Sequence, residues 1–266
     1  MSTTIINSSL SDVNLPSPMN HRVIAIGTIG SLGLTTYLAQ SFGWRQGALF
    51  VVGFAAGLIL YHAAFGFTSA WRNIVRTGNG AGLRAQLLML AITTLVFLPL
   101  IADGQFLGMD IRGNIRPLGF SVIAGAFLFG VGMQLGGGCA SGTLFTVGGG
   151  SIRMVVTLIA FVIGSALGAF HLPAWQQVGG LAPISLQTEF GTLGALTISF
   201  ALLIALWVGS VVVEQRRHGN VSAVKEREPQ QKWLRGPWPF LAGAVGLAAV
   251  NIATLLLAGR PWGVTS

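Results

Sequence analysis

The chain has 266 residues, of which 52% are hydrophobic and only 8% are charged. A soluble domain carries about 25% charged residues, so this composition excludes an ordinary soluble protein and predicts an all-α, polytopic membrane protein. The net charge of +8 does not indicate nucleic-acid binding, because the basic residues lie in short stretches beside apolar segments. The only cysteine, Cys139, excludes an intrachain disulfide and a zinc cage.

Residues 1–20 are polar, and we expect a flexible tail there rather than a cleaved signal. Residues 21–266 are predicted to form one membrane domain. Its apolar segments predict about seven transmembrane helices, at 23–40, 46–64, 83–101, 118–135, 152–170, 192–213 and 238–257. Pro117 suits the start of the fourth helix, and the polar segment 171–189 is expected to cap one face or to dip partway into the membrane.

The distribution of basic residues predicts the orientation. Six of them lie in the stretch 214–236, which is therefore the best cytoplasmic segment. Alternating the predicted helices from there puts eleven of the 15 Lys and Arg residues on one side, together with the N-terminus. These eleven include Arg72, Arg76 and Arg84, predicted in the loop after the second helix. We therefore expect a cytoplasmic N-terminus.

The stretch 130–150, GVGMQLGGGCASGTLFTVGGG, is dense in glycine and contains the cysteine. Each interior glycine costs a helix about 1 kcal/mol relative to alanine, so the run 136–138 predicts that the fourth helix breaks here and that a loop follows. Non-helical backbone survives inside a bilayer only where protein or a wet cavity surrounds it. The stretch is therefore interpreted as a pathway or binding site.

Small residues surround the Cys139 thiol in this sequence, so a ligand could reach it. Free backbone amides and the N-terminus of the next helix favour an anion, and a soft thiol suits one that contains sulfur. The predicted substrate-binding residues are Gly137, Gly138, Cys139, Ala140, Ser141, Gly142 and Thr143. The alternatives are a cysteine packed as a small hydrophobe and threonines bonded to their own helix, as Thr143 and Thr146 could be.

A shift of 73 residues lays the segment 57–66 over the segment 130–139, with Gly66 on Cys139. Transporters often build a site near the membrane midplane from corresponding broken helices in repeated halves. We therefore predict a pseudo-symmetric repeat in which Gly66, Phe67 and Thr68 face the same route as Cys139.

Two polar residues within apolar segments are candidates for gating, His62 and Gln134. Either could instead hydrogen-bond to a nearby carbonyl or join two helices. The sequence has no Ser/His/Asp set, Walker loop, catalytic carboxylate pair or metal-ligand cluster. It predicts no enzyme activity, catalytic residue, cofactor or metal.

The motif LGGGCASGTLFTVGGGS resembles the signature loop of the YeeE/YedE family of sulfur-compound transporters, and the similarity runs from about Phe50 to the terminal GRPWG. The resemblance implies an hourglass-shaped helical fold and thiosulfate uptake across the bacterial inner membrane, with cysteines on short broken helices that contact the anion. The loop cysteine corresponds to Cys139, whereas Gly66 stands at a second cysteine position between Phe65 and Phe67. A third cysteine would follow the GRPWG element, so we expect that the chain normally continues or needs a partner.

The leading hypothesis is uptake of a sulfur-containing anion, thiosulfate first, by a protein embedded in membrane lipid that delivers it to a cytoplasmic sulfur-carrier protein. One alternative is a membrane sulfur-transfer enzyme, with Cys139 as persulfide acceptor and His62 as base. The other is a partner subunit that does not itself transport.

Overall fold

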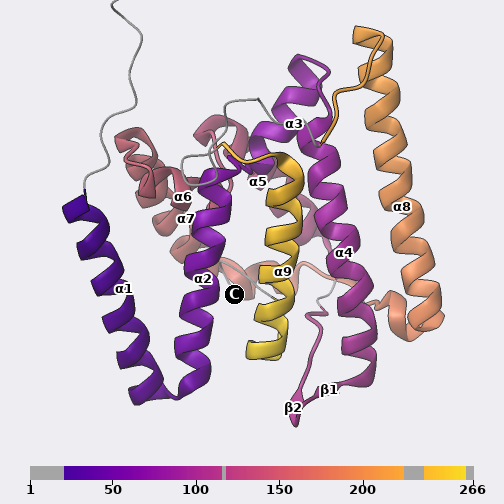
Figure 1. Ribbon diagram of the computed structural model, residues 1–266. Helices are drawn as coiled ribbons and strands as arrows, with labels where there is room; N and C mark the ends of the chain where they lie inside the picture. Colours follow the sequence, from indigo (N-terminus) through magenta and orange to yellow (C-terminus); the bar gives the residue numbers. More distant parts are fainter. Residues whose placement is uncertain (1–20, 116–117, 225–236, 262–266) are drawn as a thin grey trace, which may run out of the picture. The chain divides into compact units, whose positions relative to one another are not determined.

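The computed structural model describes residues 21–115, 118–224 and 237–261 (Figure 1). The chain divides into two compact units, residues 1–48 and residues 49–266. The first unit contains α1 (His21–Phe42) and the start of α2 (Trp44–His62). Gly43 joins these helices at a φ of +94°, a conformation that favours glycine.

The second unit holds the rest of α2 and all later elements. They are α3 (Phe67–Arg76), α4 (Ala81–Asp103), β1 (Gln105–Phe106), β2 (Met109–Asp110), β3 (Leu118–Gly119), α5 (Phe120–Gly136), α6 (Ala140–Gly148), α7 (Ile152–Gln177), β4 (Gly180–Leu181), α8 (Leu186–His218) and α9 (Phe240–Ala258). The strands pair antiparallel, β1 with β2 and β3 with β4. Seven helical stretches of the described chain are long and apolar enough to cross a membrane, which confirms the all-α polytopic prediction.

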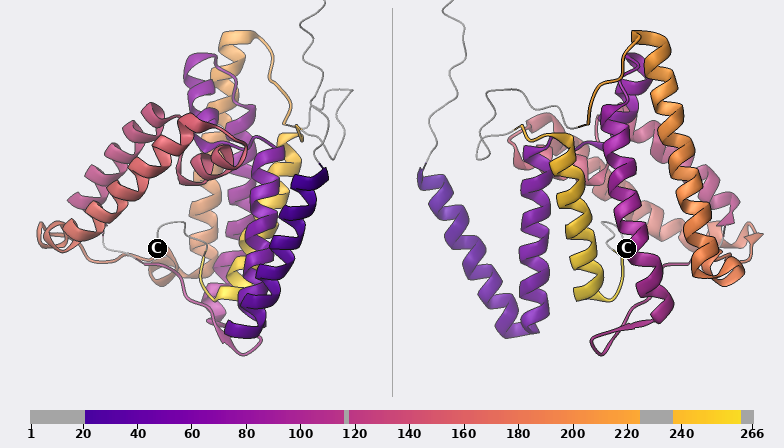
Figure 2. Two further views of the ribbon diagram at one scale, coloured as in Figure 1. Left: turned by 90° about the vertical axis from the view of Figure 1, so that its left-hand side faces the viewer. Right: turned by 45° about the vertical axis from the view of Figure 1, so that its right-hand side comes forward.

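Helix α4 is the centre of the second unit, because it packs against α3, α8 and α9. The core cluster next to it consists of Leu60, Ala63, Phe65, Ala85, Ala244 and Leu247. Small residues let α9 approach closely, since a Cβ on Gly243 would lie 2.7 Å from the Cβ of Ala63. Helices α5 and α7 pack on each other and are mostly exposed, as Figure 2 shows on its left.

The predicted repeat is visible in the order of the helices. A membrane-length helix followed by an unwound segment and a short helix occurs twice, first as α2 and α3 and then as α5 and α6. Gly66 and Cys139 are the two N-cap residues, and they are separated by the predicted 73 positions. A long helix, α4 or α7, follows each short one.

The predicted loop after Cys139 was too long. Helix α5 ends at Gly136 and α6 already begins at Ala140, so only residues 137–139 are unwound there. Gly142 lies in the first turn of α6 and Gly148 at its end, whereas Leu144, Phe145 and Val147 are apolar, and the helix packs on α7. These contacts outweigh the low helix propensity of glycine.

Two further boundaries differ from the predictions. Helix α7 continues to Gln177 and α8 begins at Leu186, so most of the segment 171–189 is helical. The predicted loop after residue 213 starts late, because α8 continues to His218. Glu214 was expected in a loop, and Arg84 was counted with the basic residues at the loop end of the third predicted helix. Both lie within helices and pair with each other in the interior. The tail 1–20, Pro117 and residues 225–236 lie outside the described part of the chain.

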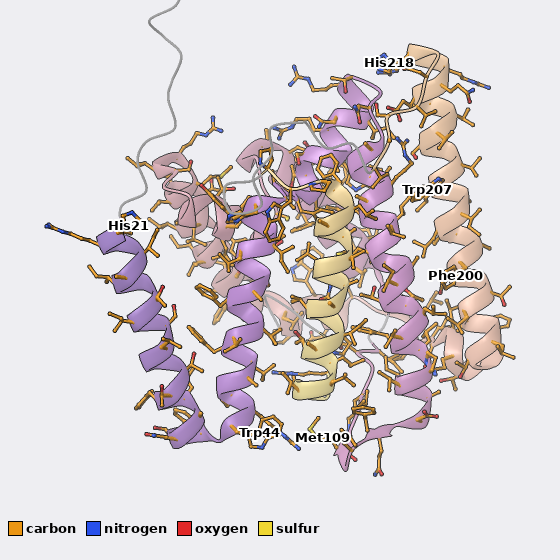
Figure 3. The ribbon with its side chains drawn as sticks, viewed as in Figure 1. His21, Trp44, Met109, Phe200, Trp207 and His218 are labelled. Atoms are coloured by element: carbon orange, nitrogen blue, oxygen red, sulfur yellow. The ribbon has the colours of Figure 1, made fainter. Side chains whose placement is uncertain are left out.

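The second unit has one end at which several basic residues gather. There Arg217 donates hydrogen bonds to the carbonyls of Val75 and Arg76, and the His218 ring bonds to the Thr77 carbonyl. The β1–β2 hairpin forms the other end, where the Arg112 amide donates to the Gly259 carbonyl. Figure 3 labels His218 and Met109 at these two ends. Arg76 and Arg217 thus share one end, as the charge pattern predicted.

Candidate functional site

The unwound segment at residues 137–139 depends on glycine. Gly137 ends α5 with a φ of +80°, and its amide donates to the Met133 carbonyl over 3.1 Å. A Cβ on Gly138 would lie 3.2 Å from the Thr143 amide nitrogen, in the first turn of α6. Glycine is therefore required at Gly137 by conformation and at Gly138 by close packing.

Cys139 is the N-cap of α6, and its side chain makes no capping hydrogen bond. Its carbonyl accepts the first helical bond, from the Thr143 amide at 2.8 Å. The amides of Ala140, Ser141 and Gly142 precede that bond, so they have no partner within the helix. The Cys139 Sγ lies 3.4 Å from the Ser141 Oγ. Gly142 leaves room for the thiol, since a Cβ there would lie 3.4 Å from the sulfur.

One cavity of about 340 Å³ brings both unwound segments together, and we call it the thiol cavity. Residues from α2, α3, α4, α5, α6 and α9 line it. They are Leu60, Phe65, Phe67, Gln86, Met89, Phe129, Cys139, Ser141, Leu247 and Asn251. Of the predicted site residues, Phe67, Cys139 and Ser141 therefore lie in one lining.

A second cavity of about 470 Å³ lies between α5, α6 and α7, and we call it the α5–α7 cavity. It takes in the predicted residues Gly138, Ala140 and Thr143, and it shares Cys139 and Phe129 with the thiol cavity. The thiol is thus accessible from two hollows.

Gly66 lines a third cavity, of about 230 Å³, which we call the vestibule. Its lining is Phe65, Gly66, Ser69, Ala70, Asn73, Thr77, Asn79, Gly82, Gln86 and Phe240. The vestibule shares Phe65 and Gln86 with the thiol cavity. The predicted route near Gly66 and the route near Cys139 are therefore neighbouring hollows with a common wall.

The sequence analysis missed Gln86 and Asn251, the two amide side chains of the thiol cavity. A signal for both was available, because each is an isolated amide within a predicted apolar span. Such residues in a membrane helix usually face the protein interior or water.

The remaining predicted residues have other surroundings. Thr68 is 2% exposed, and its hydroxyl has no hydrogen-bond partner among the described residues. The Nδ1 of His62 lies 3.1 Å from the Leu58 carbonyl, and its ring contacts the Trp238 ring at an interplanar angle of 42°. Gln134 accepts two hydrogen bonds from Arg72, one at its side-chain oxygen and one at its carbonyl. These contacts fit the structural alternatives, and gating by His62 or Gln134 stays a prediction.

The family of the chain follows from its sequence. The family model described as "Sulphur transport" matches residues 62–266, which include both unwound segments. The chain belongs to the sulphur transport family. Within the described residues, no three His, Cys, Asp or Glu side chains are grouped to hold a metal ion.

Relatives in the sulphur transport family include two kinds of named transporter. The "Probable transporter YedE" of Salmonella typhimurium is 28% identical over 214 residues, which are 77% of this chain and 49% of the relative. The "Thiosulfate transporter TsuA" of Spirochaeta thermophila is 27% identical over 221 residues, 80% of this chain and 64% of the relative. The "Thiosulfate transporter TsuA" of Escherichia coli is 27% identical over 200 residues, which are 65% of this chain and 56% of the relative.

All three relatives are named as transporters, in agreement with the prediction that this sulphur transport family member is not an enzyme. The chain spans about half the length of the YedE relative and less than two thirds of either TsuA protein.

Proposed function

We propose that the chain takes up a sulfur-containing anion across the bacterial inner membrane, with thiosulfate as the first substrate to test. The anion binds in the thiol cavity, at Cys139 and the first amides of α6. The observation that carries this proposal is the convergence of both unwound segments on one cavity, with the only thiol in its lining. Two relatives named as thiosulfate transporters support the choice of substrate.

The chemistry of the lining suits an anion in transit. The N-terminus of a helix carries a partial positive charge of about half an elementary charge. The Cys139 thiol adds a weak, polarisable donor and Ser141 a hydroxyl. Among the residues that the structure describes, no charged side chain lines the thiol cavity. Conduction requires that the anion bind and then leave, so neutral donors serve better than a tight guanidinium clamp.

The proposal includes an orientation and an acceptor. The end that carries Arg76 and Arg217 faces the cytoplasm, in keeping with the positive-inside rule. The anion leaves at that end and passes to a cytoplasmic sulfur-carrier protein. Copurification of such a protein with the chain in the presence of thiosulfate tests this part.

Replacing Cys139 tests the central claim. In a strain without other thiosulfate uptake, we expect Cys139→Ala to abolish growth on thiosulfate as the only sulfur source, because the thiol contact is lost. Immunoblots of the membrane fraction check that the variant is inserted. Thr197→Ala is the control, since this exposed hydroxyl only bonds to the Leu193 carbonyl of its own helix.

Other outcomes select among the alternatives. Growth of the Cys139→Ala strain at the parental rate would overturn the proposal. A persulfide on Cys139, with turnover in detergent but no uptake, would identify a sulfur-transfer enzyme. Uptake only in the presence of a complete relative that copurifies would identify a partner subunit.

A further inference from the structure

The thiol cavity and the vestibule are separated by a thin wall made of two side chains. Phe65 and Gln86 line both hollows. Both are buried, with 7% and 3% of their surface exposed. The vestibule beyond this wall is lined by hydroxyl and amide side chains, which are Ser69, Asn73, Thr77, Asn79 and Gln86 itself. Gln86 therefore lies at the boundary between the two hollows.

The Gln86 side chain has one oxygen without a partner. Its Nε2 donates to the Gly66 carbonyl over 3.2 Å, whereas its Oε1 has no hydrogen-bond partner among the described residues. A buried, unsatisfied amide oxygen is rare in native proteins and usually indicates an ordered water or a ligand. The wall between the two cavities is therefore expected to be wet.

The bond between Gln86 and Gly66 can be released at low cost. The Gly66 carbonyl also accepts from the Ser69 hydroxyl at 2.9 Å and from the Ala70 amide at 3.2 Å. When the Gln86 amide turns away, this carbonyl keeps two donors and is not left unsatisfied. Leaving the Gly66 carbonyl without any donor would cost free energy and would hold the Gln86 side chain in place. The two remaining donors avoid that cost.

We propose that Gln86 is a gate between the two cavities and a specificity-determining residue of the route. In the closed state its Nε2 is bonded to Gly66. In the open state the same N–H group donates to an oxygen of the passing anion, which then enters the vestibule. This inference rests on the proposed function for the identity of the anion, but the gate itself can be tested without a substrate.

The uptake test uses charge at the gate. Gln86→Glu has nearly the same shape, but it places a carboxylate where the anion passes. We expect it to lower thiosulfate uptake into vesicles at least about tenfold, since like charges a few ångströms apart repel strongly in a protein interior. Gln86→Asn keeps the amide and should retain part of the uptake. Thr93→Val on the same helix is the matched control, because this hydroxyl bonds to the Met89 and Leu90 carbonyls of α4.

The access test uses Cys139 as a reporter, since it is the only thiol in the chain. An anionic methanethiosulfonate reagent is added to membrane vesicles of each orientation, and the rate of modification is measured. From the vestibule side we expect slow modification of Cys139 in the parent and faster modification in Gln86→Ala, which shortens one of the two side chains of the wall. The rate from the other side should stay unchanged.

The two tests separate the gate from the proposed function. If the parent takes up no thiosulfate, the proposed function fails, while faster modification in Gln86→Ala would still support the gate. The gate is overturned by two results together. Cys139 would be modified at the parental rate in both Gln86→Ala and Gln86→Asn, and Gln86→Glu would take up thiosulfate as the parent does. Yields in the membrane and elution from a sizing column check that each variant folds.

Discussion

Cys139 occupies a position at which most helices have a side chain that binds their first amides. Ser, Thr, Asp and Asn are preferred at an N-cap because a side-chain oxygen accepts from the first turn. The two short helices have Gly66 and Cys139 there, and neither makes such a bond. Ser151, at the start of α7, makes no such bond either, whereas Ser185 caps α8 by accepting from the Thr188 amide. The first amides of α3 and α6 thus remain available to a ligand.

A capping side chain at residue 139 should raise the stability of the protein and abolish uptake. In Cys139→Asn the carboxamide oxygen can accept from the first turn of α6, so we expect the variant to be about 0.5–1 kcal/mol more stable than the parent. Uptake should be lost, because the thiol is removed and the same amides no longer reach the anion. Thermal unfolding in detergent and vesicle uptake measure the two effects.

The control changes the cap of another helix in the opposite sense. Ser185→Ala should lower stability by a similar amount, about 1 kcal/mol, and leave the uptake per folded molecule unchanged. If Cys139→Asn transports at the parental rate, the α6 amides do not bind the substrate.

At the scale of the element, the sequence predicts the two breaks that precede α3 and α6, but it does not predict the length of the helices that follow them. The run Gly136 to Gly138 predicts the end of α5 from glycine propensity alone. The helical state of α6 could not be predicted in this way, since it depends on packing against α7. The apolar residues of the cavity lining were equally hidden, because they come from helices that are distant in sequence. Gln86 and Asn251 did leave a signal, as isolated amides within apolar spans.

Glycines within this one element should respond differently to the same substitution. Gly137→Ala forces a side chain into the left-handed region and is expected to cost about 1–2 kcal/mol. Its Cβ would also lie 3.2 Å from the Met154 Cε. Gly130→Ala, in the interior of α5 with no neighbouring atom within 4 Å of the new Cβ, should be neutral or slightly stabilising.

Thermal unfolding of both variants checks this pair, and modification of Cys139 reports on the unwound segment. Gly137→Ala should also change the modification rate, because the break between α5 and α6 moves. Equal stability of the two variants would mean that the left-handed turn at Gly137 is not required.

At the scale of the whole molecule, charge patterning predicted which basic residues share an end but misplaced two charges. Arg84 was counted with the loop before the third predicted helix, and Glu214 with the loop after the sixth. In the structure each neutralises the other, with 2.7 Å between Arg84 Nη1 and Glu214 Oε2, and their side chains are 2% and 1% exposed. Single-sequence reasoning sees each charge alone, so it cannot find a pair formed by two distant helices.

This pair also holds the end of α8 and the chain that follows it against α4. The Glu214 carboxylate accepts from the amides of Gly80 and Ser222. Arg84 donates to the Ser222 carbonyl over 2.7 Å. This one buried pair therefore connects α4, the end of α8 and the chain after α8 at the basic end of the second unit. Its loss should affect the packing of α8 on α4 and the adjoining vestibule.

Removing one partner should be far more harmful than removing both. Arg84→Met leaves a buried carboxylate without its cation, so we expect a loss of about 3–5 kcal/mol, measured by thermal unfolding in detergent. The double variant Arg84→Met with Glu214→Leu buries no unpaired charge and should recover most of that loss.

The pair Asp110 and Arg112 is the control within the same molecule, since these side chains are 59% and 81% exposed. Asp110→Ala should change stability little, because exposed ion pairs are weak. If Arg84→Met and Asp110→Ala prove equally mild, the interior pair does not hold α8 to α4.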